Sequence, residues 1–409
     1  MAAAPQHSST QSTGFLDRFF KLSAHGTNVK TEILAGLTTF VTMAYIIIVN
    51  PLTLKDAGMD FQGLFTATIL AAALSTLVMG LFANWPFALA PGMGMNAFFT
   101  FTLTKQMGLP WQTALGVVLI SGLLAVIVTA TGLRALLIKA IPNSLKHAVG
   151  AGIGLFIMLI GLKNAGIIVP SEATMVGLGS LKSAPVLLAL FGLVLTGALV
   201  AKRVPGNILI GIVVTTLVGI PLGVTKLPTS IVAMPAAPAF MQLDFVGALK
   251  IGLIPAIFAL FFSDLFDTIG TFIGTAGKAG LLNEDGTLKG GNRALFADSI
   301  GTVLGALIGT SNTTTYVESA AGIAAGGRTG LTAVTVSALF LLCLFFSPIA
   351  LAVPAVATAP ALIIVGILMA QAVLEIDLHD FYEAFPAILT AVFMPFTFSI
   401  ATGLALGFV

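Results

Sequence analysis

The chain has 409 residues, of which 57% are hydrophobic and only 8% are charged, and its mean hydropathy is +1.06. Soluble domains carry about 25% charged residues. This composition therefore excludes a soluble globular protein and predicts a polytopic, all-α membrane protein. The net charge of +2 is too small to favour a nucleic-acid partner, and a single cysteine, Cys343, excludes a disulfide framework.

Residues 1–30 are predicted to form a cytoplasmic tail, whose start is rich in Ala, Ser, Thr and Gln. The tail lacks the apolar stretch of a signal peptide. Apolar runs of membrane-spanning length then recur along the chain. We place them near 31–50, 63–82, 87–104, 111–132, 149–167, 183–201, 205–223, 251–275, 294–309, 312–326, 329–347, 359–374 and 384–400. A last run begins near 401 and stops at Val409, so we expect an incomplete final span.

The connections between spans indicate the orientation. With the N-terminus in the cytoplasm, Lys and Arg residues on the inside outnumber those on the outside by about two to one, as the positive-inside rule requires. We therefore expect a plasma-membrane protein (inner membrane in a bacterium) with a cytoplasmic N-terminus. Four polar connections are predicted to be surface helices or loops, and a fifth to be an exposed turn: 133–148, 168–182, 226–250, 375–383 and 276–293.

Two spans contain sequences that oppose a continuous helix. The third contains Ala90-Pro91-Gly92, and the tenth contains the β-branched run Thr313-Thr314-Thr315. Each should form an extended piece followed by a short half-helix. These are the third elements of two sets of seven spans that start near 31 and 251, and an odd number of spans inverts the second set. Interrupted spans at matching positions of inverted repeats predict a transporter binding site.

Ionisable residues within the spans point to the same region. Of sixteen Asp and Glu residues, we place Asp264, Asp267 and Glu318 deep in the membrane and Asp298 nearer the interface. A charge in hydrocarbon costs several kcal/mol, so such residues usually mark a site or a pathway. Asp264 and Asp267 lie one helical turn apart on one side.

The chemistry of these segments suggests a class of ligand. Carboxylates accept hydrogen bonds, whereas the half-helices after Asn96 and Thr315 offer backbone N–H donors. A ligand held between them should carry donors and acceptors on a planar edge, as a nucleobase does. Phe98 and Tyr316 are candidates to stack on such a ligand, although most aromatic residues in membrane helices serve packing.

Structural roles remain open for each of these residues. Residues 315–318 fit a capping box, in which Glu318 satisfies its own helix terminus. Asn96 is a candidate N-cap, and Asp264 is a candidate link between helix ends. Asp267 is flanked by Thr268 and Thr271, which could satisfy it locally. No His-based metal or proton site is visible, because the four histidines lie outside the predicted spans: His7, His25, His147 and His379. We expect neither a metal nor a cofactor.

With these motifs, the sequence resembles the AzgA-type purine permeases of the nucleobase–cation symporter-2 family. The resemblance covers nearly the whole chain. It is carried by Gly36-Leu37-Thr38-Thr39-Phe40 with Asn50-Pro51, by Ala90 through Gly94 with Asn96 through Phe99, by Phe266-Asp267-Thr268 with Gly270-Thr271, and by Gly309-Thr310-Ser311 with Tyr316 through Ser319 and Gly327 through Gly330.

The resemblance implies fourteen spans in two inverted repeats of seven. It divides the chain into a core domain, 31–132 and 251–347, and a gate domain, 133–250 and 348–409. It implies that hypoxanthine, guanine or adenine is taken up with protons and bound by Asp267 and Glu318. Asp264 and Asn96 fall at functionally important motif positions, and Asp264 also joins the candidates for proton coupling. An exposed gate domain would allow a homodimer. The final gate span departs from the family pattern by ending at Val409.

Other functional classes fit less well. A membrane enzyme of the prenyl-transferase kind needs a second Asp-rich motif, and an intramembrane aspartyl protease needs an Asp after Gly-x-Gly; both are missing. An anion transporter of similar architecture would favour cationic or neutral linings over three buried acids. Sodium coupling stays open beside proton coupling, because carboxylates and Thr hydroxyls also bind Na⁺. We therefore predict a transporter and not an enzyme.

Overall fold

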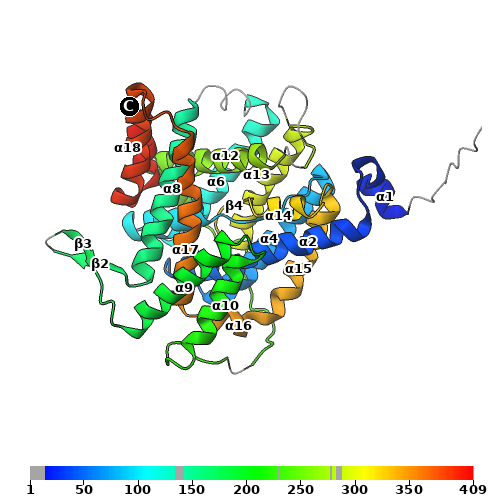
Figure 1. Cartoon of the computed structure of the whole chain (residues 1–409). Coiled ribbons are helices and arrows are strands. Elements are labelled where there is room, and N and C mark those ends of the chain that lie inside the picture. Colours follow the sequence, from blue (N-terminus) through cyan, green and yellow to red (C-terminus); the bar gives the residue numbers. More distant parts are fainter. Residues whose placement is uncertain are drawn as a thin grey trace, which may run out of the picture.

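The structure, a computed structural model, describes residues 14–133, 142–172, 174–228, 230–276, 279–281 and 288–408. Helices dominate this part of the chain (Figure 1). Eight of the helices found there are long and apolar enough to cross a membrane: Val29–Lys55, Phe61–Ala83, Trp111–Ala130, Asn143–Asn164, Ala184–Ala201, Ile254–Phe272, Gly330–Leu351 and Ala355–Glu375. The total of fourteen spans stays a prediction.

The first part of the chain begins with a short helix inside the predicted tail, α1 (Phe15–Phe20). Nine further elements lead to the end of the fourth predicted span: η1 (Ser23–His25), α2 (Val29–Met43), α3 (Ile46–Lys55), α4 (Phe61–Val78), the π-helical η2 (Met79–Ala83), β1 (Leu89–Pro91), α5 (Met93–Ala97), the π-helical η3 (Phe98–Gln106) and α6 (Trp111–Ala130). Six more precede residue 250: α8 (Asn143–Asn164), β2 (Ile168–Ser171), β3 (Met175–Leu178), α9 (Ala184–Ala201), α10 (Asn207–Gly219) and α11 (Phe245–Ala248).

The second part of the chain repeats the pattern of long helices around one broken segment. Its helices and strand are α12 (Ile254–Ala276), α13 (Gly291–Ile308), β4 (Thr313–Thr315), α14 (Ser319–Ala324), α15 (Gly330–Leu342), α16 (Ser347–Leu351), α17 (Ala355–Ala370), α18 (Phe381–Thr397) and α19 (Ile400–Phe408).

The helices pack in two groups. Helices α2, α4, α6, α13 and α15 contact one another, and α8, α9, α10, α17 and α18 form the second group. Figure 1 shows α8 and α17 running side by side. Helix α10 contacts α2 directly across the two groups, and α12 packs against α6 on one side and α8 on the other. Helix α5 also contacts α8. Small residues allow the close approach: a Cβ on Gly94 of α5 would lie 2.4 Å from Ile153 Cγ2 of α8.

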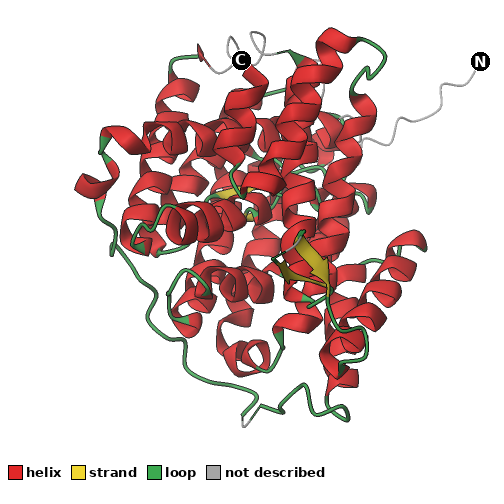
Figure 2. Ribbon diagram, turned by 90° about the vertical axis from the view of Figure 1, so that its left-hand side faces the viewer, coloured by secondary structure: helices red, strands yellow, loops and turns green. Residues whose placement is uncertain are grey.

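The two broken segments meet in the middle of the molecule. Strands β1 and β4 pair antiparallel, with Leu89 opposite Thr315 and Pro91 opposite Thr313. Figure 2 shows this pair surrounded by helices. In a membrane, exposed backbone groups are tolerated only where protein satisfies them, and here each strand supplies the partner of the other. The predicted extended piece followed by a short half-helix is confirmed in both segments.

Several connections differ from the prediction. Residues 168–182, expected as a helix or loop, contain the hairpin β2–β3, so two short strand pairs interrupt an otherwise helical fold. Helix α8 begins at Asn143, six residues before the predicted span, and therefore includes Lys146 and His147. The predicted turn at 276–293 lies mostly outside the described residues.

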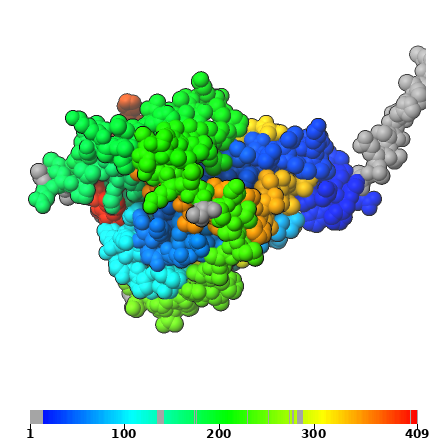
Figure 3. All heavy atoms as spheres, turned by 90° about the horizontal axis from the view of Figure 1, so that it is seen from below, coloured from blue at the N-terminus to red at the C-terminus, as the bar shows by residue number. Residues whose placement is uncertain are grey.

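The connection between α10 and α12 crosses one face of the molecule as an extended strap, which Figure 3 shows from below. Backbone N–H groups fasten it: Ala233 donates to Phe345 O, Met241 to Leu307 O and Asp244 to Gln112 O. At its end the Asp244 carboxylate caps α11 by accepting from Gly247 N at 2.8 Å.

Candidate functional site

Two adjoining cavities lie between the broken segments and α8. The smaller, of about 90 Å³, borders β4 and α5, and the larger, of about 530 Å³, extends to Lys146 and His147 at the start of α8. Asp267 and Glu318 line both. The larger cavity, which we call the vestibule, thus adjoins the smaller one, and its volume lies within the roughly 300–1,000 Å³ typical of ligand pockets.

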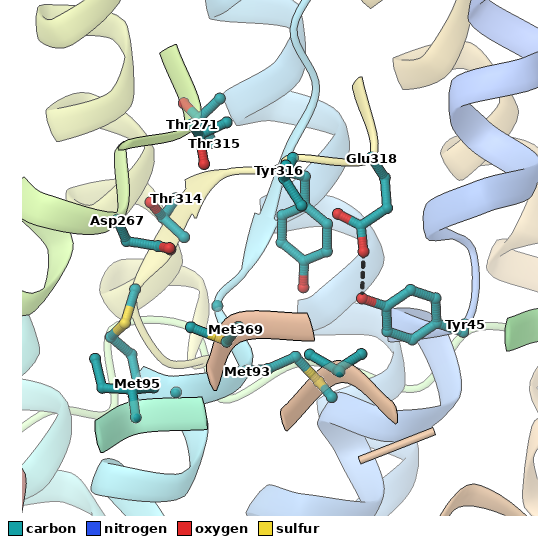
Figure 4. Close-up of a pocket in the computed structure, with 15 residues that line it drawn as sticks. Tyr45, Met93, Met95, Asp267, Thr271, Thr314, Thr315, Tyr316, Glu318 and Met369 are labelled. Carbon is teal, nitrogen blue, oxygen red and sulfur yellow. Dashed lines mark hydrogen bonds between the residues drawn. The ribbon is translucent and has the colours of Figure 1, made fainter. Parts of the chain in front are cut away.

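Asp267 projects into the cavity from α12 (Figure 4). It is half-buried, and no described residue donates a hydrogen bond to its carboxylate. A buried carboxylate normally has its hydrogen bonds satisfied. Of the two local partners that the sequence offers, Thr268 donates to Asp298 Oδ2 at 2.8 Å, and Thr271 lines the cavity without a hydrogen bond to Asp267. Asp267 thus keeps its acceptor capacity for whatever occupies the cavity.

Glu318 reaches the cavity from the start of α14. Its Oε1 accepts a hydrogen bond of 2.6 Å from the hydroxyl of Tyr45, which lies between α2 and α3 and is 1% exposed. The capping-box interpretation is wrong: Glu318 itself stands before α14 without a side-chain cap, and the Thr315 hydroxyl donates to Asp298. The charge-assisted hydrogen bond from the Tyr45 hydroxyl fixes the orientation of the Glu318 carboxylate.

Asp298 corrects another prediction. We expected it near the interface, but it is fully buried in α13 behind β4. Its Oδ1 accepts from Thr315 N at 3.0 Å and from Thr315 Oγ1 at 2.9 Å, and its Oδ2 accepts from Thr268. The carboxylate therefore holds the broken segment in register with α12. Thr314, the residue before Thr315, lines the cavity and shares a hydrogen bond with Thr268.

Tyr316 and several methionines form the rest of the wall. In Figure 4 the Tyr316 ring lies between Asp267 and Glu318, with Met93 and Met369 on the other side of the space. The Tyr316 hydroxyl is occupied, because it donates to Pro91 O at 2.5 Å. Its ring is thus held in place, while methionine side chains adapt to the shape of a ligand. A flat molecule with polar edges suits this combination.

The other predicted site residues lie behind the wall. Asn96 is buried inside α5 and accepts a hydrogen bond from Ser311 Oγ; Gly92, not Asn96, is the N-cap residue of α5. Asp264 is 2% exposed and Phe98 is 1% exposed, and neither lines the two cavities. The structure therefore brings together Asp267, Glu318 and Tyr316, and leaves Asn96, Asp264 and Phe98 outside the cavity lining.

Some lining residues escaped prediction. The sequence could have indicated Tyr45, because tyrosine is rare in this chain, which has 30 Phe and only three Tyr. A tyrosine inside an apolar run indicates a need for its hydroxyl. Lys146 and His147 were missed because α8 starts earlier than its hydropathy suggests. Within the described residues, no group of three His, Cys, Asp or Glu could hold a metal ion.

Comparison with known proteins shows which family the chain belongs to. A model described as "Permease family" matches residues 30–406. The chain belongs to this family. A permease of Methanocaldococcus jannaschii is 55% identical over 397 residues, which cover 97% of this chain and 91% of the relative. The adenine permease AdeP of Escherichia coli (46% identical; 99% and 91% covered) and the guanine/hypoxanthine permease PbuG of Bacillus subtilis (46%; 96% and 92%) are similar over nearly their whole lengths.

These relatives confirm the resemblance to purine permeases. Among solved structures, the transmembrane domain of a cyanobacterial bicarbonate transporter, BicA, superimposes with a TM-score of 0.70 at 18% identity, over 92% of this permease and 97% of that domain. At this identity the likeness concerns the fold alone. The permease is thus a multi-pass membrane protein with a transporter fold, built around a cavity with two carboxylates.

Proposed function

We propose that this permease imports purine nucleobases (adenine, guanine or hypoxanthine) by proton symport, with the base held between Asp267 and Glu318. One observation carries the proposal: carboxylates from α12 and from the broken tenth segment line the same cavity. Purines present N–H donors on their edges, and carboxylates accept such bonds strongly. The adenine and guanine/hypoxanthine permeases among its relatives support a purine as substrate.

The residues divide the work of binding. Asp267, which has no donor among the described residues, would accept from an N–H of the base. Glu318, oriented by Tyr45, would accept from a second N–H, and Tyr316 would pack against the ring face. Asn96, Asp264 and Phe98, which are buried, would support the wall from behind. Asp264 lies three residues before Asp267 on α12 and would join a proton path.

The buried setting of the carboxylates supports proton coupling. Burial favours the neutral form of a carboxylic acid, so Asp267 or Glu318 could take up a proton with the base and release it inside. A proton that enters with a neutral base moves one charge down the membrane potential. That supplies about 2.3 kcal/mol per 100 mV, which is enough for roughly fifty-fold accumulation.

Alternating access would arise from movement between two domains of fourteen spans in all. The helix group with α2, α4, α6, α13 and α15 falls within the predicted core, 31–132 and 251–347, and the other group falls within the predicted gate. The vestibule opens toward Lys146 and His147, at the end of α8 that we predict to be cytoplasmic. We infer that the structure is inward-open in a plasma membrane with the N-terminus inside.

Uptake into proteoliposomes tests the proposal. Radiolabelled adenine, guanine and hypoxanthine would be supplied at varied pH, membrane potential and Na⁺, with Asp267→Asn and Glu318→Gln beside the wild type. Asp377→Asn is the matched control, because Asp377 is an exposed acid that lines neither cavity. We expect both site variants to lose at least nine-tenths of uptake, about 1.4 kcal/mol of binding or more, and the control to keep it.

Distinct results would overturn distinct parts. Uptake indifferent to pH and potential but dependent on Na⁺ would replace proton coupling by sodium coupling. Full uptake by both site variants would refute the site assignment. Transport of bicarbonate instead of purines would favour the anion alternative that the fold of BicA raises. Two carboxylates facing the cavity argue against that outcome, because they repel an anion.

A further inference from the structure

A third cavity, of about 810 Å³, lies apart from the substrate site. It is bordered by the segment after α1, by residues 81–85 beyond α4, by residues 279–281 and by the start of α13. None of its lining residues takes part in the two cavities around Asp267 and Glu318. It opens on the face that we predict to be cytoplasmic, where nothing in transport of a base requires a cavity.

The lining of this third cavity is cationic. Its basic residues are Lys21, His25, Lys289, Arg293 and Arg328, and no described lining residue is acidic. The side-chain donors of Arg328 and Lys289 bond to neutral carbonyls: Arg328 Nη1 donates to Ile323 O at 2.6 Å and to Gly327 O at 2.7 Å, and Lys289 Nζ donates to Gly280 O at 3.2 Å. These bonds hold the two side chains in position without an acidic partner. One carboxylate of the neighbourhood, Glu32, accepts from the backbone N–H of Arg328 at 2.9 Å and does not line the cavity.

The cavity wall is part of the folded structure and not a loose surface loop. Asn84, in a left-handed backbone conformation with φ of 55°, donates from its carboxamide to Phe20 O and accepts from Gly330 N, both at 2.9 Å. Phe20 and Leu22 also pack against Leu331 at the start of α15. The segment that carries Lys21 is therefore clamped to the helices beneath it.

The rim of the cavity is apolar. Phe19 is 49% exposed, Leu81 46% and Phe82 48%, and α1 also presents Phe15 at 79% exposure. Figure 1 shows α1 at one end of the molecule, beside α2. A short helix with exposed aromatic residues next to cations is typical of the membrane interface, where its apolar face sinks to the depth of the headgroups. The rim would thus face acyl chains while the cations face phosphates.

We propose that this cavity binds the phosphate headgroup of an anionic phospholipid, with the acyl chains against Phe19, Leu81 and Phe82. Basic pockets at the cytoplasmic ends of membrane helices recognise such headgroups. A free phosphate would use the same cations but would leave the apolar rim in contact with water. The apolar rim favours the lipid as the occupant.

Thermal unfolding of the purified permease in a neutral detergent tests the proposal. Phosphatidylglycerol, phosphatidylcholine and inorganic phosphate are the three probes, and native mass spectrometry counts retained lipids. The double variant K289Q/R293Q removes two exposed cavity cations, and K202Q/K226Q removes two exposed cations elsewhere as the matched control. Arg328 is left intact because its guanidinium supports the backbone.

We expect phosphatidylglycerol to raise the unfolding temperature more than the other two probes. In K289Q/R293Q its apparent affinity should fall about thirtyfold, as expected for two cations near an anionic headgroup, and K202Q/K226Q should match the wild type. If K289Q/R293Q fails to fold, R293Q alone provides the comparison, with a loss of about fivefold. Equal protection by inorganic phosphate would overturn the lipid as occupant. A cavity variant that responds like the wild type would overturn the site.

Discussion

Asp298 offers the sharpest test of how the broken segment is held. The structure gives its carboxylate hydrogen bonds from Thr315 N, Thr315 Oγ1 and Thr268 Oγ1, at 3.0, 2.9 and 2.8 Å. Single side-chain hydrogen bonds in membrane proteins contribute about 0.6 kcal/mol on average and about 1.7 kcal/mol at most. Loss of all three in Asp298→Ala should therefore lower the free energy of unfolding by about 2–5 kcal/mol.

Asp298→Asn separates geometry from charge. The carboxamide oxygen of the variant can still accept from Thr315. Its NH₂ group can donate to the Thr268 hydroxyl, which replaces the bond that Thr268 donates to Asp298 Oδ2. We expect it to retain more than half of the stability that Asp298→Ala loses. Thermal unfolding of detergent-purified protein, with and without adenine, measures both variants.

The outcome for binding follows from the same contacts. Thr314 lines the cavity one residue before the anchored Thr315, so Asp298→Ala should weaken adenine binding and Asp298→Asn should largely preserve it. Equal loss of stability in the two variants would refute the positioning role. A stable Asp298→Asn variant that transports as poorly as Glu318→Gln would instead place Asp298 in the binding or proton-transfer machinery.

Three further predictions concern other parts of the molecule. Tyr45→Phe removes the 2.6 Å hydrogen bond to Glu318, so the KM for purine uptake should rise about tenfold or more, while the protein stays folded. Gly330→Ala should destabilise the fold by about 1–3 kcal/mol or more in thermal unfolding, because its Cβ would lie 1.9 Å from the Gly80 carbonyl oxygen. Hydrogen bonds from the Gly247 backbone and then from Thr113 lower the pKa of Asp244. Its stabilisation is therefore full above the ordinary carboxyl pKa and disappears as pH falls through the lowered value; Asp244→Asn should remove this acid sensitivity.

Each of these predictions has a control and a refuting result. Tyr382→Phe alters an exposed tyrosine and should leave uptake unchanged; an unchanged KM in Tyr45→Phe would show that Glu318 needs no orienting partner. Gly252→Ala meets no atom within 4 Å and should be neutral, so equal effects at Gly252 and Gly330 would contradict the packing argument. For Asp244, identical unfolding temperatures of wild type and variant from pH 7 down to pH 3 would contradict the capping role.

The sequence predicts local structure well where physics leaves few choices. Prolines and glycines near Pro91 and a run of threonines near Thr314 oppose a helix, and both segments are extended. Carboxylates in apolar surroundings need a purpose, and Asp267 and Glu318 do meet at a cavity. These inferences depend only on which residues stand next to one another, and this information is read directly from the sequence.

The sequence fails where the answer depends on the third dimension. Asp298 was placed near the interface because it stands early in its span, but α13 carries it behind β4. Tyr45 and Glu318 are 273 residues apart along the chain, and no local sequence pattern predicts their contact. Asp264 and Asp267 share one helix and still differ, because a small rotation decides which of them lines the cavity.

The pairing of β1 with β4 has a consequence for how the permease is made. Tyr316 beside β4 and Pro91 at the end of β1 are 225 residues apart in the chain. At about 5–20 residues per second, a ribosome needs roughly 10–45 seconds to synthesise that interval. Throughout that time the backbone groups of β1 lack their final partners in an environment that tolerates few unpaired groups. The N-terminal half is therefore not a self-sufficient folding unit, and a nascent chain arrested before Thr313 should remain dependent on insertion factors and exposed to membrane proteases.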